Sequence, residues 1–65
     1  MGFCENLKNL RKANAIDQSV LASKLSISSK TVSHWETGYT EPSISQLIAL
    51  ANFFDVTIDE LVDRN

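Results

Sequence analysis

Apolar residues recur at helical spacing near the N-terminus. Phe3, Leu7 and Leu10 lie four and three residues apart, which is the spacing of one helix face. The pattern stops near Asn14, a residue that tolerates the left-handed backbone conformation with which many helices end. We therefore predict a first helix over about residues 3–13.

A second, short helix is predicted to end near residue 25. Asp17 can cap its N-terminus by accepting hydrogen bonds from backbone N–H groups. Leu21, Ala22 and Leu25 then form its inward stripe. Val20 stands three residues after the cap and cannot be the acidic partner of a capping box, so this N-terminus lacks a complete box.

A third short helix follows after a brief turn. Ser28 is a suitable N-cap, and Gly38 is the residue best suited to a helix C-cap. Val32 and Trp35 lie three residues apart on one face between these caps. We assign Trp35 to the core, because it faces the interior together with Val32.

Two further helices are predicted after the break at residues 42 and 43. The inward face of the fourth helix is predicted from five apolar positions: Ile44, Leu47, Ile48, Ala51 and Phe54. In the last helix Thr57 and Glu60 form a capping box, and Leu61 and Val62 supply an apolar face.

The predicted fold class is all-α. No stretch alternates between apolar and polar residues with a period of two, and no hairpin dipeptide such as Asn-Gly occurs. The 65 residues, 43% of them apolar, suit one small domain that spans residues 1–65 and folds on its own.

Residues 17–37 have the features of two helices that cross steeply over a tight turn. Ala22 supplies the small side chain that such a crossing needs at its closest approach. The outward positions of the third helix all carry side chains that can form hydrogen bonds: Ser29, Lys30, Ser33, His34 and Thr37. Short polar side chains on such a helix can reach base edges and phosphates in the major groove of DNA.

The sequence resembles the Cro/C1-type helix-turn-helix family of phage and bacterial repressors. The resemblance covers almost the whole chain and implies a compact, five-helix, lambda-repressor-like domain whose second and third helices form the helix-turn-helix. The matching residues are Leu10, Arg11, Lys12, Asp17, Gln18, Leu21, Ala22, Lys24, Leu25, Ser28, Thr31, Val32, Ser33, Trp35, Glu36, Gly38, Pro42, Ser43, Leu47, Leu50, Ala51 and residues 56–61.

The resemblance also implies roles for individual residues. Gln18 stands where the family touches phosphate and braces the recognition helix, and Arg11 and Glu36 stand where relatives form a partly buried ion pair. The positions at which the family contacts bases are Ser28, Ser29, Lys30, Ser33 and His34. The positions at which it grips the DNA backbone are Thr37, Tyr39 and Thr40.

Some positions depart from the family pattern. Ser26 stands at the turn position usually held by glycine, so it must adopt a left-handed or neighbouring conformation with some strain. Asp17 replaces the usual threonine. Ser29 and His34 stand where many relatives have arginine, so DNA affinity should depend less on charge than in those relatives.

The net charge of −2 is unevenly distributed. Residues 1–40 carry a net charge of +2 and residues 41–65 carry −4, so one part of the chain can face phosphate while the other faces away. A single histidine and a single cysteine predict no metal site and no internal disulfide, and no cofactor is expected. Catalysis is not expected either, since no nucleophile–base pair or glycine-rich phosphate loop is present.

The predicted function is sequence-specific binding of double-stranded DNA by a prokaryotic or phage transcriptional regulator, a repressor that acts as a homodimer. No apolar run approaches the roughly 20 residues needed to cross a bilayer, and we expect the cytoplasm. Two alternatives stay open. The chain can be an antitoxin-type module that masks a partner protein and binds DNA for autoregulation, or it can be the DNA-binding part of a longer protein.

Overall fold

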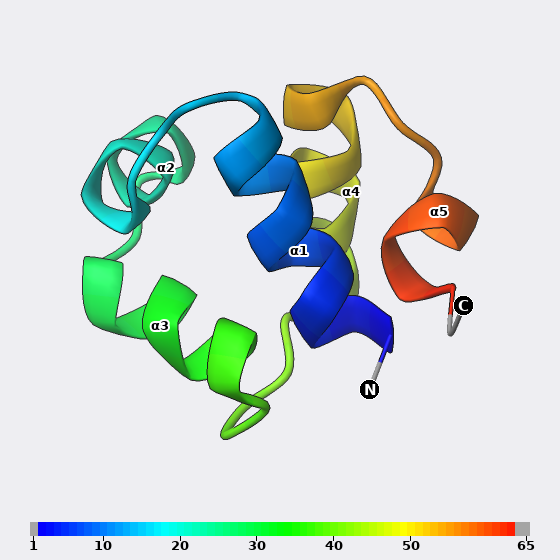
Figure 1. The fold of residues 1–65 in the computed structure, drawn as a ribbon. Coiled ribbons are helices and arrows are strands. Elements are labelled where there is room, and N and C mark those ends of the chain that lie inside the picture. The colour runs from blue at the N-terminus through cyan, green and yellow to red at the C-terminus, as the bar shows by residue number, and fades with distance from the viewer. Residues whose placement is uncertain (1, 64–65) are drawn as a thin grey trace.

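The computed structural model describes residues 2–63, which form five α-helices and no strands (Figure 1). This result confirms the predicted all-α fold class. The helices are α1 (Gly2–Ala13), α2 (Gln18–Leu25), α3 (Ser29–Thr37), α4 (Ile44–Phe54) and α5 (Ile58–Val62). In Figure 1, α2 and α3 lie on one side of α1, and α5 lies on the other.

All five helices contribute to one core. α1 packs against both α3 and α5, α2 packs against α3, and α4 packs against α5. Trp35 is 1% exposed, which confirms its assignment to the core. The rings of Trp35 and Phe3 are in an edge-to-face contact, with their centroids 6.5 Å apart. The buried apolar residues are Phe3, Leu7, Leu21, Ala22, Val32, Trp35, Leu50, Ala51 and Leu61.

The predicted helix caps form as expected. The side chain of Asp17 accepts a hydrogen bond from the backbone N–H of Val20, and that of Ser28 accepts one from Thr31. Thr57 and Glu60 form the reciprocal capping box. A second capping box, which was not predicted from the sequence, lies at the start of α4, where Ser43 and Gln46 satisfy each other's backbone N–H groups.

The end of α1 differs from the prediction by one residue. Ala15, not Asn14, has the positive φ of 56°. The side-chain amide of Asn14 instead donates to the carbonyl of Leu10 at 2.8 Å. This bond satisfies one of the carbonyls left open at the helix end, and the chain then turns at the next residue.

The predicted inward face of α4 is partly wrong. Ile44 is 76% exposed and Ile48 is 47% exposed, whereas Leu50 is fully buried beside Ala51. Apolar residues occur around most of the circumference of α4, so helical periodicity alone does not choose the buried face. The predicted apolar face of α5 divides in the same way, since Leu61 is fully buried and Val62 is 41% exposed.

A side chain from α1 closes the C-terminal end of α5. The side-chain amide of Asn6 donates to the carbonyl oxygens of Glu60, Leu61 and Asp63 at 3.1, 3.0 and 2.7 Å. Glu60 and Leu61 belong to the last turn of α5 and Asp63 is its C-cap, where backbone carbonyls have no partner within the helix. The contact fixes the last helix against the first, over a separation of more than 50 residues in the sequence.

Candidate nucleic-acid interface

The turn between α2 and α3 is tight and well defined. Ser26 has φ 58° and ψ 41°, the left-handed conformation predicted for a serine at this position. Its backbone N–H and that of Ile27 both donate to carbonyls of the last turn of α2, and the Ile27 bond to Ala22 is 3.0 Å long. These bonds offset the strain of a left-handed non-glycine residue, which is about 1–2 kcal/mol.

Two caps fix the length and direction of α3. At its N-terminus the Ser28 hydroxyl lies 3.2 Å from the backbone nitrogen of Thr31 and 3.0 Å from the Thr31 hydroxyl. At its C-terminus Gly38 has a φ of 81°, and its backbone N–H donates to the last carbonyls of the helix. Both ends of α3 are therefore fixed by caps.

The two faces of α3 have opposite character. Val32 and Trp35 are fully or almost fully buried, and Glu36 joins them at 6% exposure. The predicted base-contacting residues lie outside this buried face: Ser28, Ser29 and Lys30 are exposed, and Ser33 and His34 are half-buried. The predicted backbone-contacting residues Thr37, Tyr39 and Thr40 are exposed at the end of the helix and just after it.

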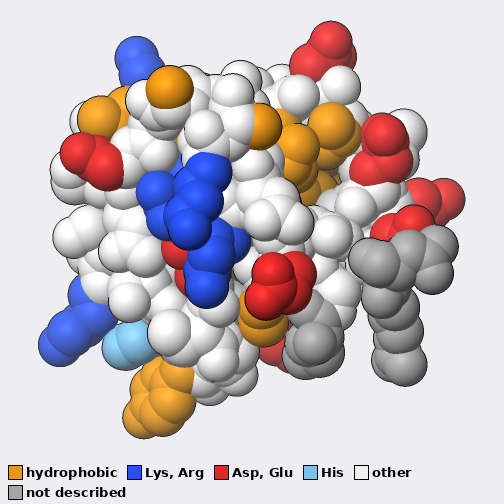
Figure 2. Space-filling view, viewed as in Figure 1, with side chains coloured by type: hydrophobic (Ala, Val, Ile, Leu, Met, Phe, Trp, Pro, Cys, Tyr) orange, Lys and Arg blue, Asp and Glu red, His pale blue; other side chains and the backbone are white. Residues whose placement is uncertain are grey.

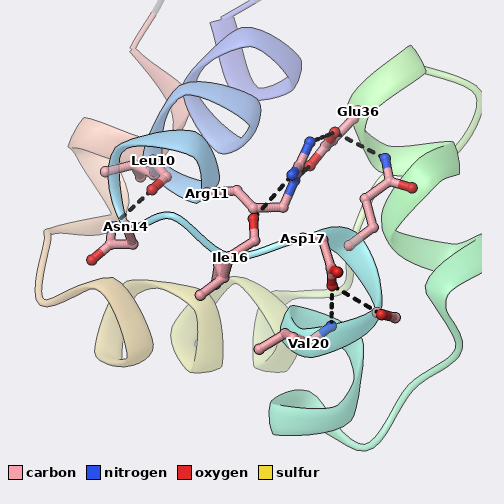
Figure 3. A network of polar contacts seen from close by, with 9 residues as sticks. Leu10, Arg11, Asn14, Ile16, Asp17, Val20 and Glu36 are labelled. Atoms are coloured by element: carbon pink, nitrogen blue, oxygen red, sulfur yellow. Dashed lines mark hydrogen bonds and ion pairs between the residues drawn. The ribbon is translucent and has the colours of Figure 1, made fainter.

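A network of charge-assisted hydrogen bonds joins α1, α2 and α3 (Figure 3). The guanidinium of Arg11 donates to both carboxylate oxygens of Glu36, from Nε at 2.7 Å and from Nη2 at 3.0 Å. Its Nη1 donates to the carbonyl of Ile16 at 3.1 Å. The structure thus brings together the predicted ion pair in a bidentate geometry, which is the strongest arrangement for this pair of groups.

Gln18 also belongs to this network. Its side-chain Nε2 donates to Glu36 Oε1 at 3.1 Å, so the first residue of α2 is tied directly to the buried face of α3. The side chain of Gln18 is half-buried. The bracing expected from the resemblance is therefore present in the free protein, and contact with phosphate stays a prediction.

The network shifts the pKa values of its members. Burial raises the pKa of Glu36, but the hydrogen bonds from Arg11 and Gln18, together with the positive charges of Arg11 and Lys8, outweigh burial and hold it below its ordinary value. The hydrogen bond to Glu36 raises the pKa of Arg11. The backbone hydrogen bond from Val20 lowers the pKa of Asp17, because it favours the carboxylate.

A contact near the C-terminus of α3 was missed by the sequence analysis. The rings of His34 and Tyr39 meet at a tilt of 58°, with their centroids 4.7 Å apart. The carbonyl of His34 accepts hydrogen bonds from the backbone N–H of Tyr39 at 2.9 Å and of Thr40 at 3.4 Å. A spacing of five residues across a glycine C-cap is the only sequence signal for this contact.

Charge is asymmetric on the surface. In the space-filling view, Lys and Arg side chains lie over the side formed by α1, α2 and α3, and most Asp and Glu side chains lie toward α5 (Figure 2). This arrangement follows the predicted division between residues 1–40 and 41–65. A basic side next to the polar face of α3 suits a polyanionic ligand.

Three further features of the described part of the chain concern metal, small-molecule and membrane binding. Residues 2–63 contain no group of three or more side chains that could hold a metal ion. A cavity of about 230 Å³ lies between the start of α1 and the segment after α3, where Phe3, Cys4, Thr40 and Leu47 line it. No helix within the same residues is long and apolar enough to span a bilayer.

The chain is similar to known proteins over almost its whole length. The family model described as helix-turn-helix matches residues 7–61. The transcriptional activator BcrR of Enterococcus faecalis is 40% identical over 62 residues, which are 95% of this chain and 30% of that protein. The phage CTXphi transcriptional repressor RstR of Vibrio cholerae is 33% identical over 64 residues, which are 98% of this chain and 57% of that protein.

Solved structures show the same fold. The P22 c2 repressor protein, in complex with the synthetic operator 9T, matches with a TM-score of 0.91 and 28% identity, over 100% of this chain and 98% of that one. A transcriptional regulator from Listeria innocua matches with a TM-score of 0.90 and 38% identity, over 97% of this chain and 59% of that one. The chain spans about 30 to 57% of the lengths of the sequence relatives it matches.

The lowered pKa of Glu36 predicts how stability depends on pH. A carboxylate whose pKa is lower in the folded state stabilises the fold above its unfolded pKa and loses that contribution as the pH falls through the folded value. We expect the free energy of unfolding, measured by urea denaturation, to fall between about pH 5 and pH 2. Glu36→Gln should make this fall shallower.

Glu41→Gln is the matched control, because it removes an exposed carboxylate outside the network. The free energy of unfolding of Glu41→Gln should depend on pH more nearly as that of the wild type does than that of Glu36→Gln. Equal slopes for the wild type and Glu36→Gln would show that Glu36 does not have a lowered pKa in the folded state.

Proposed function

Because the chain belongs to the helix-turn-helix family, we propose that it is a transcriptional regulator that reads double-stranded DNA by inserting α3 into the major groove. The observation that carries this proposal is the division of α3 into a buried face, fixed by the Arg11–Glu36–Gln18 network, and a polar outer face. A short helix held in this way can present the same side chains to each base pair it meets. The likeness to a repressor in complex with its operator supports the same reading.

We assign base contacts to the outer side of α3. Lys30 is exposed on the first turn and can donate to O6 and N7 of guanine. Ser29, Ser33 and His34 offer both donors and acceptors, so they tolerate more than one base. Ser28 completes the set, although its hydroxyl is also engaged in capping the helix through Thr31.

We assign phosphate contacts to groups at the two ends of the helix-turn-helix. Gln18 begins α2, where backbone N–H groups and the helix dipole favour an anion. Thr37, Tyr39 and Thr40 lie at and beyond the end of α3, and all are exposed. Contacts of this kind position the protein on the duplex without specifying its sequence.

A homodimer on a two-fold symmetric operator is the proposed binding unit, with half-sites about one helical turn, or 10 base pairs, apart. Ile58 and Val62 on α5 are 37% and 41% exposed, and they offer an apolar surface for self-association. Repression follows when such a dimer occupies a promoter. Because both an activator and a repressor are among the relatives, the sign of regulation is part of this proposal.

The exposed apolar side chains of α4 and α5 also support a second candidate function. Ile44, Ile48 and Phe53 are 76%, 47% and 38% exposed on α4, in addition to the two residues on α5. A different protein could be the partner that covers them, as in an antitoxin-type module that binds DNA for autoregulation. We therefore retain this function as an alternative to that of a dedicated repressor.

Selection of duplexes from a random pool by the purified chain tests the proposed function. We expect enrichment of a two-fold symmetric motif at low salt and at near-physiological salt, because base contacts add to the salt-dependent phosphate contacts. Absence of any enriched sequence at either salt concentration would contradict DNA reading by this chain and favour the protein-binding alternative.

Substitutions of Lys30 and Gln18 should affect the selected duplex differently. Lys30→Ala should cost about 1–3 kcal/mol at one base position if the ammonium reads guanine, and it should relax the preference at that position. Gln18→Ala should weaken binding to all sequences by a similar factor, because phosphates are alike in every duplex. Titration of the selected duplex and its single-base variants measures both effects.

Lys24→Ala is the matched control for the loss of a positive charge, since Lys24 is exposed on α2 and has no assigned base contact. Its effect should not depend on the base sequence. Equal losses on every sequence for Lys30→Ala and Gln18→Ala would show that Lys30 only contacts phosphate.

A further inference from the structure

His34 and Tyr39 form an aromatic pair at the surface, at the point where α3 ends. Their ring centroids are 4.7 Å apart and the rings are tilted by 58°. His34 belongs to the last turn of α3, and Tyr39 is the first residue after the Gly38 cap. In the space-filling view the imidazole lies at the surface beside apolar side-chain atoms (Figure 2).

The backbone holds Tyr39 in place relative to His34. The carbonyl of His34 accepts hydrogen bonds from the backbone N–H of Tyr39 at 2.9 Å, from that of Thr40 at 3.4 Å and from the Thr37 hydroxyl at 3.2 Å. Gly38 supplies the left-handed turn, with a φ of 81°, that brings the next residue back over the helix end. The cap therefore fixes the backbone of Tyr39 close to His34, where its ring meets the imidazole.

The exposure of Tyr39 is unusual for a ring that is only part of the scaffold. Its side chain is 76% exposed, so the ring adds little to the apolar core. His34 is half-buried, and Tyr39 lies against its ring. An imidazole on a free surface samples several rotamers, and a ring packed against it restricts that freedom before any ligand binds.

We propose that Tyr39 is a positioning residue that orients the imidazole of His34 for contact with a base in the major groove. This inference rests on the proposed function and goes beyond it, because the family resemblance assigns Tyr39 to the DNA backbone alone. The two roles differ in the group they use. Orientation of His34 needs the aromatic ring of Tyr39, whereas a phosphate contact needs its hydroxyl.

Two substitutions of Tyr39 separate these roles. Tyr39→Phe keeps the ring and removes the hydroxyl, while Tyr39→Ala removes both. If the ring orients His34, Tyr39→Ala should bind the selected duplex about 3- to 10-fold more weakly, since a freed side chain must be ordered again on binding. Its preference among duplexes that differ only at the base pair read by His34 should become weaker. Tyr39→Phe should retain the preference of the wild type.

The base pair concerned is found by measuring which position of the selected duplex loses its preference in His34→Ala. The double variant His34→Ala/Tyr39→Ala should then show the same reduced preference at that position as His34→Ala alone, because the effects of coupled residues are not additive. Tyr39→Leu provides a second ring-free variant with an apolar side chain and should behave like Tyr39→Ala.

Nuclear magnetic resonance of the free protein tests the ring contact without DNA. The imidazole protons of His34 should show a ring-current shift in the wild type and in Tyr39→Phe that disappears in Tyr39→Ala. A thermal melt of each variant confirms that the domain still folds, as expected for a side chain that is 76% exposed.

The possible outcomes are distinguishable. Uniform and equal losses for Tyr39→Phe and Tyr39→Ala on every sequence would show a phosphate contact and overturn the positioning role. An unchanged preference in Tyr39→Ala would overturn that role alone and leave the proposed function intact. A wild-type chain that selects no DNA sequence would overturn both.

Discussion

Among residues 2–63, Glu36 is the one charged side chain that is buried, and the placement of α3 depends on how its charge is balanced. Arg11 binds both of its carboxylate oxygens, and Gln18 binds one of them. An unpaired charge at this depth would cost about 3–5 kcal/mol. The three side chains must therefore meet in one arrangement, and they bring α1, α2 and α3 together when they do.

This constraint has a consequence for DNA binding. Gln18 is at once a partner of the buried carboxylate and the first residue of α2, where we propose a phosphate contact. One hydrogen bond then links the proposed phosphate contact to the helix for which we propose base contacts. The outer residues of α3 take no part in the core, so they can change between relatives without cost to the fold. The TM-score of 0.91 at only 28% identity shows that the fold is kept although most residues differ.

The sequence predicted features whose physical cause is local. Caps at Asp17, Ser28 and Gly38 depend on residues within a single turn. The left-handed conformation of Ser26 was expected from the family resemblance, in which glycine usually holds that turn position. The buried face of α4 was not predictable in this way, because Ile44, Ile48 and Leu50 are equally apolar and only the packing of the rest of the core separates them. The tie of Asn6 to α5 and the contact between His34 and Tyr39 likewise depend on the folded geometry. The ion pair came from the family resemblance, because no local rule connects Arg11 with Glu36. The resemblance also added Gln18, Ser28, Tyr39 and Thr40 to the outward polar positions of α3, which helical spacing had already indicated.

The most direct test of the central constraint is the DNA affinity of the double variant Arg11→Met/Glu36→Met, measured on the selected duplex and compared with Arg11→Met alone. Replacing a buried ion pair with apolar side chains of similar volume is often neutral for stability, whereas removing one partner is strongly destabilising. If the pair positions α3, the double variant should recover most of the stability lost in Arg11→Met and still bind the duplex about tenfold more weakly, a loss of about 1.4 kcal/mol, with reduced discrimination between bases. A stable double variant that binds with wild-type affinity and discrimination would contradict this dependence.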